Sequence, residues 1–185
     1  MDDREKLIPP HGGYQKLKSF QMAEIVYDAT VKFVGRFIDK RSRTVDQMVQ
    51  AARSGRQNIA EGSMASGTSK KTELKLVGVA RASLEELLLD LQDYLRQNDL
   101  PLWDKDDARA KEVRTIGSQC NRSYMRYKLY IESSQAEIAA NTIICLIHQT
   151  SYLLDQQLRQ LEQQWLKEGG FTEKLYNSRQ NAKYQ

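Results

Sequence analysis

Proline and glycine are scarce in this sequence, with 3 Pro and 10 Gly among 185 residues. An all-β fold needs a turn roughly every 8–12 residues, and so few turn-forming residues cannot supply them. Helix-favouring Leu, Glu, Gln, Lys, Arg and Ala dominate instead. The composition therefore predicts an all-α protein, and the length fits one domain, with or without an appendage.

Histidine and cysteine are rarer still, which restricts the possible chemistry. The chain has 2 His and 2 Cys, and Cys145 with His148 would supply only two zinc ligands. The residues three and four positions from His148 include no carboxylate, and the Glu-x-x-His pattern of di-iron bundles is absent. Gly62 and Gly67 lack the strand and the lysine spacing of a phosphate-binding loop. We therefore expect no catalytic residue, no metal and no cofactor, in a protein that is not an enzyme.

Long hydrophobic runs are also missing. The longest, residues 143–147, is far shorter than the ~20 residues that a membrane-spanning helix needs. Residues 1–18 are polar and contain no apolar core of a signal peptide. Cys120 and Cys145 lie in apolar contexts that are typical of reduced, buried cysteines. These features predict a cytoplasmic protein that has no membrane partner.

The charge is mild overall but unevenly distributed. The net charge is +4 and the isoelectric point is near 9.0. Residues 36–81 hold ten basic and four acidic side chains, residues 82–104 hold six acidic and one basic, and residues 105–130 are basic again. Zones of this kind can present a basic face to an acidic partner, or they can make complementary contacts between copies of the chain. Ordinary solvent-exposed helix faces would show the same distribution of charge.

The spacing of apolar residues predicts five main helices. We expect them over residues 20–38, 45–61, 70–97, 106–132 and 135–167, with a short helical turn after Thr172. Ser19 and Thr44 are the expected N-caps of the first two, and Gly62 is placed to end the second. Double apolar stripes on the first and third helices indicate burial against more than one neighbour.

These helices predict an antiparallel up-and-down four-helix bundle with an additional C-terminal helix. The expected division is a flexible arm over residues 1–18, a bundle core over 19–134, a long packed helix over 135–168, and a short helix or frayed tail over 169–185. Whether the fourth bundle helix is 105–132 or 137–167 stays open.

A polar motif interrupts the contact between the second and third helices. Folding these helices back about a turn centred within 62–68 sets Glu61 near Lys70, Asn58 near Glu73, and Arg81 level with Gln50. A carboxylate in the last helical turn opposes the helix dipole, so Glu61 needs a cationic partner such as Lys70 or Lys71. The purely structural interpretation is a polar latch, that is, a set of polar contacts that fixes the register of the two helices.

The same motif carries a family resemblance. Gln57-Asn58-Ile59-Ala60-Glu61-Gly62, followed by Ala80-Arg81-Ala82-Ser83-Leu84-Glu85-Glu86, resembles the signature of a bacterial four-helix bundle protein family. That family includes proteins encoded in ribosomal RNA intervening sequences and the accessory variability determinant of diversity-generating retroelements. The likeness covers about residues 17–97. The longer C-terminus resembles the branch with a suffix helix, and it departs from the short members.

The resemblance implies a homopentamer of bundles that binds RNA or DNA through a basic surface. In the retroelement branch it also implies a reverse transcriptase as partner. The positions carried over as structural are Asn58, Glu61, Gly62, Ser83 and Glu85. The candidate nucleic-acid contacts in or beside the motifs are Arg53, Arg56, Lys70, Lys71, Lys75 and Arg81.

Two functions compete for the basic zone. The first is a non-enzymatic oligomeric accessory protein that binds nucleic-acid phosphates without reading base sequence. The second is a structural scaffold in which the basic zone of one subunit pairs with the acidic 82–104 zone of its neighbour. The same residues serve both functions, and the arrangement of charge in space is what distinguishes them.

Overall fold

A computed structural model describes residues 11–118, 122–169 and 171–183, and within these ranges every regular element is a helix, which confirms the all-α prediction. After a short 3-10 helix, η1 (Tyr14–Lys16), the α-helices are α1 (Lys18–Phe37), α2 (Arg43–Ala65), α3 (Lys70–Gln97), α4 (Ala108–Ser118), α5 (Tyr124–Ile131), α6 (Ala136–Glu168) and α7 (Phe171–Lys183). No helix in these ranges is both long and apolar enough to cross a membrane.

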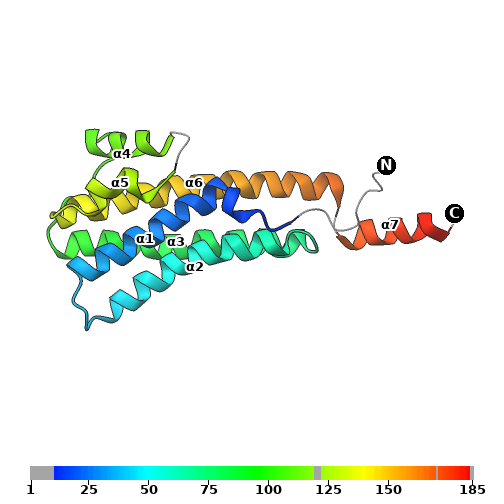
Figure 1. Ribbon diagram of the computed structural model, residues 1–185, viewed down its shortest axis with the longest axis horizontal. Coiled ribbons are helices and arrows are strands. Elements are labelled where there is room, and N and C mark those ends of the chain that lie inside the picture. Colours follow the sequence, from blue (N-terminus) through cyan, green and yellow to red (C-terminus); the bar gives the residue numbers. More distant parts are fainter. Residues whose placement is uncertain (1–10, 119–121, 170, 184–185) are drawn as a thin grey trace.

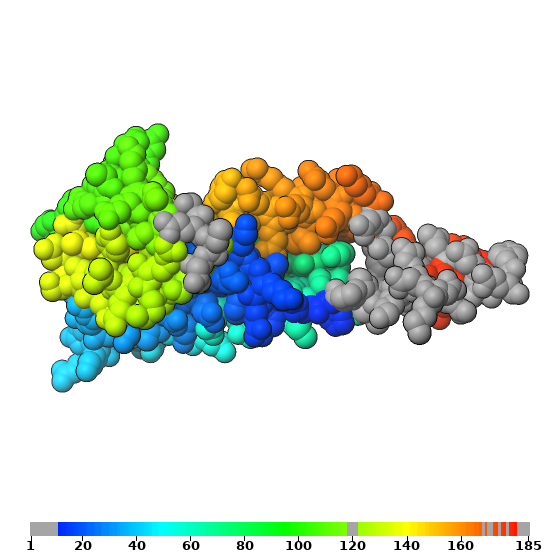
Figure 2. Space-filling model, turned by 45° about the horizontal axis from the view of Figure 1, so that its top comes forward, coloured from blue at the N-terminus to red at the C-terminus, as the bar shows by residue number. Residues whose placement is uncertain are grey.

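Four long helices surround the main core. α1 packs on α2, α2 on α3, α3 on α6, and α6 returns to α1, with neighbours running in opposite directions (Figure 1). The fourth bundle helix is therefore α6, and the predicted division into a complete core over 19–134 and an added helix over 135–168 is wrong. The segment between α3 and α6 forms α4 and α5 instead, which pack on the outside of α6. Figure 2 shows α4, in green, projecting from the surface beside α6.

α6 occupies this position because its first half is apolar all round. Residues 143–147 are all buried between the other bundle helices on one side and α4 and α5 on the other. Cys145 is buried with them, and burial raises the pKa of its thiol. Cys120 lies outside the described residues.

Several helix ends differ from the prediction. Ser42, not Thr44, caps α2, since its side chain accepts a hydrogen bond from the Thr44 amide. Ser19 lies inside α1 and donates instead to Gln157 Oε1 at 2.8 Å, which ties the start of α1 to α6. The expected helix over 106–132 is two helices, α4 and α5.

The chain ends are also more regular than expected. Residues 11–17 of the predicted flexible arm contain η1, and the Gly12 amide donates to the Ser63 carbonyl at 3.1 Å. Tyr14 contacts the ring of Phe20 edge-on, so this segment closes the end of the core. Beyond α6, the predicted short helix or frayed tail includes the helix α7.

α2 continues one turn past Gly62, and this changes its register against α3. Gly62 is buried in the α2–α3 contact, where a Cβ would lie 3.4 Å from the Glu73 carbonyl oxygen. The turn consequently lies at residues 66–69, with Ser69 as the N-cap of α3. The prediction that Gly62 ends the helix is wrong, because a glycine in helical conformation also permits close approach of two helices.

Candidate nucleic-acid and self-association surfaces

A polar contact joins α2 to α3 in this region, but the residues predicted for the latch do not form it. Asn58 Nδ2 donates to the Ser54 carbonyl at 2.9 Å and lies 3.1 Å from Ser54 Oγ. Ser54 Oγ lies 2.9 Å from Oγ of the buried Ser83, and this contact joins α2 to α3. Asn58 is therefore not placed near Glu73, because the longer α2 shifts the register by more than one turn.

The two glutamates carried over as structural positions face solvent. Glu61 and Glu85 are exposed, and Lys70 pairs with Glu73 at 3.1 Å rather than with Glu61. Glu73 is buried at the start of α3. Burial raises the pKa of Glu73, and the charge and hydrogen bond of Lys70 only partly oppose this rise.

This buried carboxyl makes a testable contribution to the pH dependence of stability. The raised pKa means that the folded protein binds the Glu73 proton more tightly than the unfolded chain, so stability falls as pH rises through the folded pKa. We expect Glu73→Gln to be more stable than wild type at about pH 7. The difference should shrink as the pH falls toward the ordinary value of 4.5.

Urea unfolding across this pH range measures the effect. The control is Glu61→Gln, which removes the same charge from an exposed site on α2 and should change stability little at any pH. A Glu73→Gln effect that stays constant with pH would show that the carboxyl acts through packing and not through its proton.

Three of the six predicted nucleic-acid contacts are engaged within the chain. The Arg56 guanidinium stacks on the Tyr27 ring, 4.5 Å from its centroid. Arg81 Nε lies 2.6 Å from Asp155 Oδ1 on α6. The Ser54–Ser83 contact shows that its predicted position level with Gln50 on α2 is wrong, because residue 81 then lies more than one turn of α2 beyond Gln50. Lys70 pairs with Glu73, as described above.

The other three candidates are exposed but do not form one patch. Lys71 and Lys75 lie one turn apart at the start of α3, whereas Arg53 lies near the middle of α2. A Cβ on Gly55, close to Arg53, would touch Leu84, which places this part of α2 several turns away from the lysines. The sequence therefore predicts basic residues correctly without predicting where they gather.

Lys71 and Lys75 belong to a larger group that we call the basic end. The α2–α3 turn and the last turns of α6 lie at the same end of the bundle, and α1 begins level with Gln157, about three turns before α6 ends (Figure 1). The exposed cationic side chains on these segments are Lys16, Lys18, Lys71, Lys75, Arg159 and Lys167. The exposed carboxylates on the neighbouring turns are Glu24, Glu61 and Glu162. Sequence reasoning missed Lys16, Lys18, Arg159 and Lys167 because they are far from the motif along the chain.

The outer face of α3 changes sign along its length. Lys71 and Lys75 lie in its first two turns, whereas Glu85, Glu86 and Asp93 are exposed in its second half. Exposed apolar residues accompany both halves, with Val79 39% and Leu89 56% exposed. This face is therefore complementary in charge to another copy of itself.

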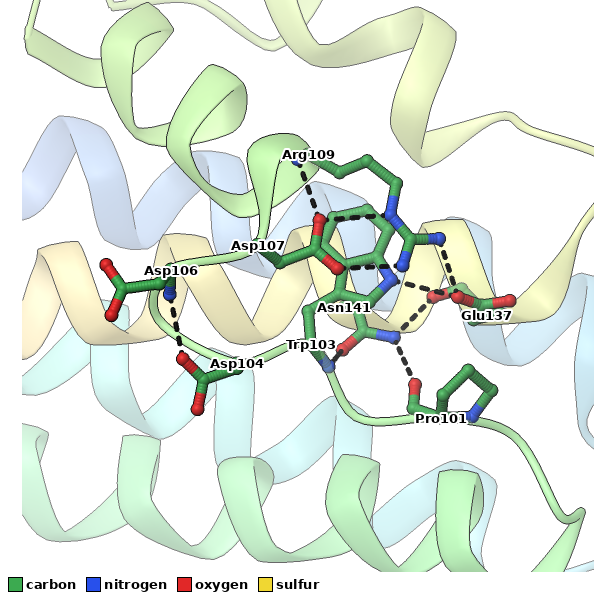
Figure 3. Close-up of polar contacts among 8 residues, drawn as sticks. All are labelled: Pro101, Trp103, Asp104, Asp106, Asp107, Arg109, Glu137 and Asn141. Atoms are coloured by element: carbon green, nitrogen blue, oxygen red, sulfur yellow. Dashed lines mark hydrogen bonds and ion pairs between the residues drawn. The ribbon is translucent and has the colours of Figure 1, made fainter.

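A polar clasp holds the segment before α4 against α6 (Figure 3). The buried Asn141 accepts a hydrogen bond from the Trp103 amide at 2.8 Å, and its Nδ2 donates to the Pro101 carbonyl at 2.9 Å. Glu137 accepts from Trp103 Nε1 and from Arg109, each at 2.9 Å. Trp103 is buried, whereas its neighbour Leu102 is 51% exposed. The clasp fixes where α4 leaves the bundle.

Arg109 extends this clasp with charge. Its guanidinium lies 4.5 Å from the centroid of the Trp103 ring, and it forms ion pairs with Asp107 at 2.8 Å and Glu137 at 2.9 Å. Hydrogen bonds from Arg109 lower the pKa of Asp107 to about 2. The pairs that form the clasp are 28 to 40 residues apart, and for this reason no local pattern predicts them.

The residues considered for metal or thiol chemistry are separated. No group of three or more His, Cys, Asp or Glu within residues 11–118, 122–169 and 171–183 is placed to hold a metal ion. His148 is exposed on α6, whereas Cys145 is buried.

Comparison with known proteins adds no relative: no family model, no curated protein and no solved structure matches this chain. The resemblance of the 57–62 and 80–86 motifs to the bacterial four-helix bundle family therefore stays a prediction. Any function assigned to the chain depends on its own residues.

Proposed function

We propose that this chain is a non-enzymatic, homo-oligomeric bundle protein that binds RNA or DNA through its basic end as an accessory factor. The supporting observation is the group of exposed cations contributed by α1, α3 and α6 with the segment before α1. Phosphate oxygens are the natural partners of such a group, since they carry the regular negative charge of every nucleic acid.

The character of the basic end favours binding without sequence preference. Five of its six cations are lysines, which bind phosphate as point charges, whereas bidentate recognition of guanine uses arginine more often. Each helix contributes these side chains to an exposed end of the bundle, and none of the six is among the residues that pair with acids in the described structure. Affinity should therefore depend strongly on salt and weakly on base sequence.

The double variant Lys71→Gln/Lys75→Gln tests this proposal. Filter binding of unrelated RNA and DNA sequences across salt concentrations should show weaker binding to all of them. The slope of log affinity against log salt should fall by roughly 0.7–0.9 for each phosphate that the variant no longer neutralises. The matched control is Lys40→Gln/Lys128→Gln, which removes two exposed lysines outside the basic end and should leave the slope nearly unchanged.

Wild-type protein that retains no nucleic acid at low ionic strength would contradict this function. Equal losses in the two double variants would also contradict it, because they would indicate a general effect of net charge rather than a site.

The charge reversal along α3 favours a second candidate, a scaffold that assembles with itself and binds no nucleic acid. The basic half of α3 in one subunit would contact the acidic half in the next, with Val79 and Leu89 contributing apolar area. The family resemblance adds the expectation of a pentamer. Native mass spectrometry gives the number of subunits, and a monomer at micromolar concentration would contradict assembly in both candidates.

The two candidates differ in what happens on charge reversal. For the scaffold, Lys75→Asp and Asp93→Lys should each weaken assembly, and their combination should restore it. For the nucleic-acid binder, the Lys75→Asp loss of RNA retention should persist in the combined variant, because Asp93 lies outside the basic end.

A further inference from the structure

The largely exposed aromatic side chains gather on one part of the fold. In the described part of the chain they are Tyr152, Trp165 and Tyr176, which are 62%, 40% and 63% exposed. All three lie on the second half of α6 or on α7, whereas the aromatic rings of α1, α3 and α5 are buried or half-buried. Exposed apolar side chains that are concentrated in one region mark an interaction surface more often than the same residues scattered singly.

Exposed cations alternate with these rings along the chain. Arg159 and Lys167 precede and follow Trp165 on α6, and Arg179 lies one turn after Tyr176 on α7. Figure 1 shows α7 continuing outward from the end of the bundle, and α7 packs extensively on no other described helix. The ring and the cation of α7 are therefore open to a partner.

Trp165 lies beside the basic end. The Arg81–Asp155 ion pair sets these two residues at the same level of the bundle. α3 and α6 run in opposite directions, so ten residues back along α3 and ten forward along α6 set Lys71 level with Trp165. Leu161, one turn earlier on the same stripe of α6, is only 7% exposed, so Trp165 lies where the bundle core ends.

Positive charge predominates around this ring. On these turns of α3 and α6, the exposed charges of the described residues are positive at Lys71, Lys75, Arg159 and Lys167 and negative at Glu162. A partner with regular negative charge and flat apolar faces fits this combination. Nucleic acid supplies both, as phosphates and as bases.

Only an unpaired strand presents the faces of its bases to such rings. In a duplex the bases stack on one another, and a protein reaches only their edges in the grooves. Stacking on aromatic side chains is typical of single-strand binding, and it tolerates any sequence because every base has a π-face. Contacts to phosphates alone would favour the duplex at least as much, since its charge is more closely spaced. The preferred form of the strand therefore distinguishes stacking from charge.

We propose that the basic end binds single-stranded nucleic acid in preference to duplex, with the rings of Trp165 and Tyr176 stacking on unpaired bases and the neighbouring cations contacting the phosphates. This inference rests on the proposed function and adds to it the form of the strand. Tyr152 is outside the stacking surface, because thirteen residues place it on roughly the opposite face of α6 from Trp165.

Tryptophan fluorescence of the full chain tests the inference, because the chain has 2 Trp and Trp103 is buried in the clasp of Figure 3. The probes are a short mixed-sequence strand, as DNA and as RNA, alone and annealed to its complement in the same buffer. We expect the single strand to quench the fluorescence of Trp165 and to bind at least about fivefold more tightly than the duplex.

Trp165→Leu and Tyr176→Leu each keep an apolar side chain and remove the ring. In filter binding, each should weaken the single strand about fivefold or more and leave the duplex nearly unchanged. Trp165→Leu should also abolish the quenching, since only the buried Trp103 remains. The matched control is Tyr152→Leu, which removes an exposed ring from the other face of α6 and should leave both affinities unchanged.

Failure of this inference and failure of the proposed function give different results. Wild type that binds the duplex as tightly as the single strand would overturn the inference and leave nucleic-acid binding intact, whereas wild type that retains neither form at low ionic strength would contradict both. Folded Trp165→Leu and Tyr176→Leu variants that bind the single strand as the wild type does would also overturn it. If these variants lose subunits in native mass spectrometry, the rings belong instead to a contact between copies of the chain. Thermal unfolding shows which variants fold, and the comparison of strand forms in the wild type needs no variant.

Discussion

Replacing Asn141 with alanine is expected to lower the free energy of unfolding by about 3 kcal/mol, because several hydrogen bonds to a buried amide are removed together. Asn141 is 1% exposed, and its side chain bonds the Trp103 amide, the Pro101 carbonyl and the Glu137 carbonyl at 2.8–2.9 Å. Alanine leaves the Trp103 N–H and the Pro101 carbonyl without this partner. A buried group that loses its hydrogen bond also retains the full penalty of its removal from water.

The matched control is Asn98→Ala at the end of α3. The Asn98 side chain donates to the Tyr94 carbonyl at 2.8 Å, but the residue is exposed, and water can replace the bond. We expect a loss below about 1 kcal/mol there. Urea unfolding compares the two variants, and equal losses would contradict a structural clasp at Asn141.

Hydrogen exchange gives a second measurement of the same change. Because the clasp anchors residues 101–109 to α6, Asn141→Ala should release α4 before the four bundle helices unfold. Amides of α4 should therefore exchange faster, while those of α3 keep their protection. Uniformly faster exchange would indicate global destabilisation without a local role.

The elements that the sequence predicts well are those with a long periodic pattern. The third predicted helix, over 70–97, coincides with α3, because its leucine seam lasts several turns and Ser69 is a good N-cap. The burial of residues 143–147 follows from a run that has no polar face. Both features depend on neighbours within one helix, and local sequence contains that information.

The features that the sequence does not predict depend on contacts between distant segments. A glycine such as Gly62 is typical of a helix end, yet Gly62 lies inside α2, where α2 comes close to the Glu73 carbonyl of α3. This one error moves the register of α3 and misplaces the partners of Asn58 and Glu61. Arg81 likewise finds Asp155 across the bundle, a contact that no periodicity indicates.

The same limit applies to the candidate surfaces. The amino-acid composition shows the basic zone over 36–81, but its candidate contacts do not lie together. Arg56, Lys70 and Arg81 have partners within the chain. Lys71 and Lys75 lie at the basic end, and Arg53 lies near the middle of α2. The basic end combines lysines from α1 and α3 with an arginine and a lysine from α6 only because the first turns of α1 and α3 and the second half of α6 lie in the same half of the bundle. A surface made of helix ends requires the topology before it can be recognised.

The close contact of α2 with α3 at Gly55 leads to a second large effect. A Cβ at this position would lie 2.8 Å from Leu84 Cδ2 and 2.9 Å from Leu84 Cγ, and Leu84 is fully buried. Gly55→Val should therefore force the helices apart and lower the free energy of unfolding by about 2–3 kcal/mol, as overpacked cores do. Gly55→Ala should have a smaller effect of the same sign.

Gly78 supplies the comparison that separates packing from helix propensity. It lies in the interior of α3, and a Cβ there would meet no atom within 4 Å. Gly78→Ala should raise the free energy of unfolding by up to about 1 kcal/mol, since alanine favours helix over glycine. Thermal or urea unfolding of Gly55→Ala and Gly78→Ala should then give changes of opposite sign for the same substitution. A stabilising Gly55→Ala would show that Leu84 moves aside easily, and that the α2–α3 distance does not depend on a glycine at position 55.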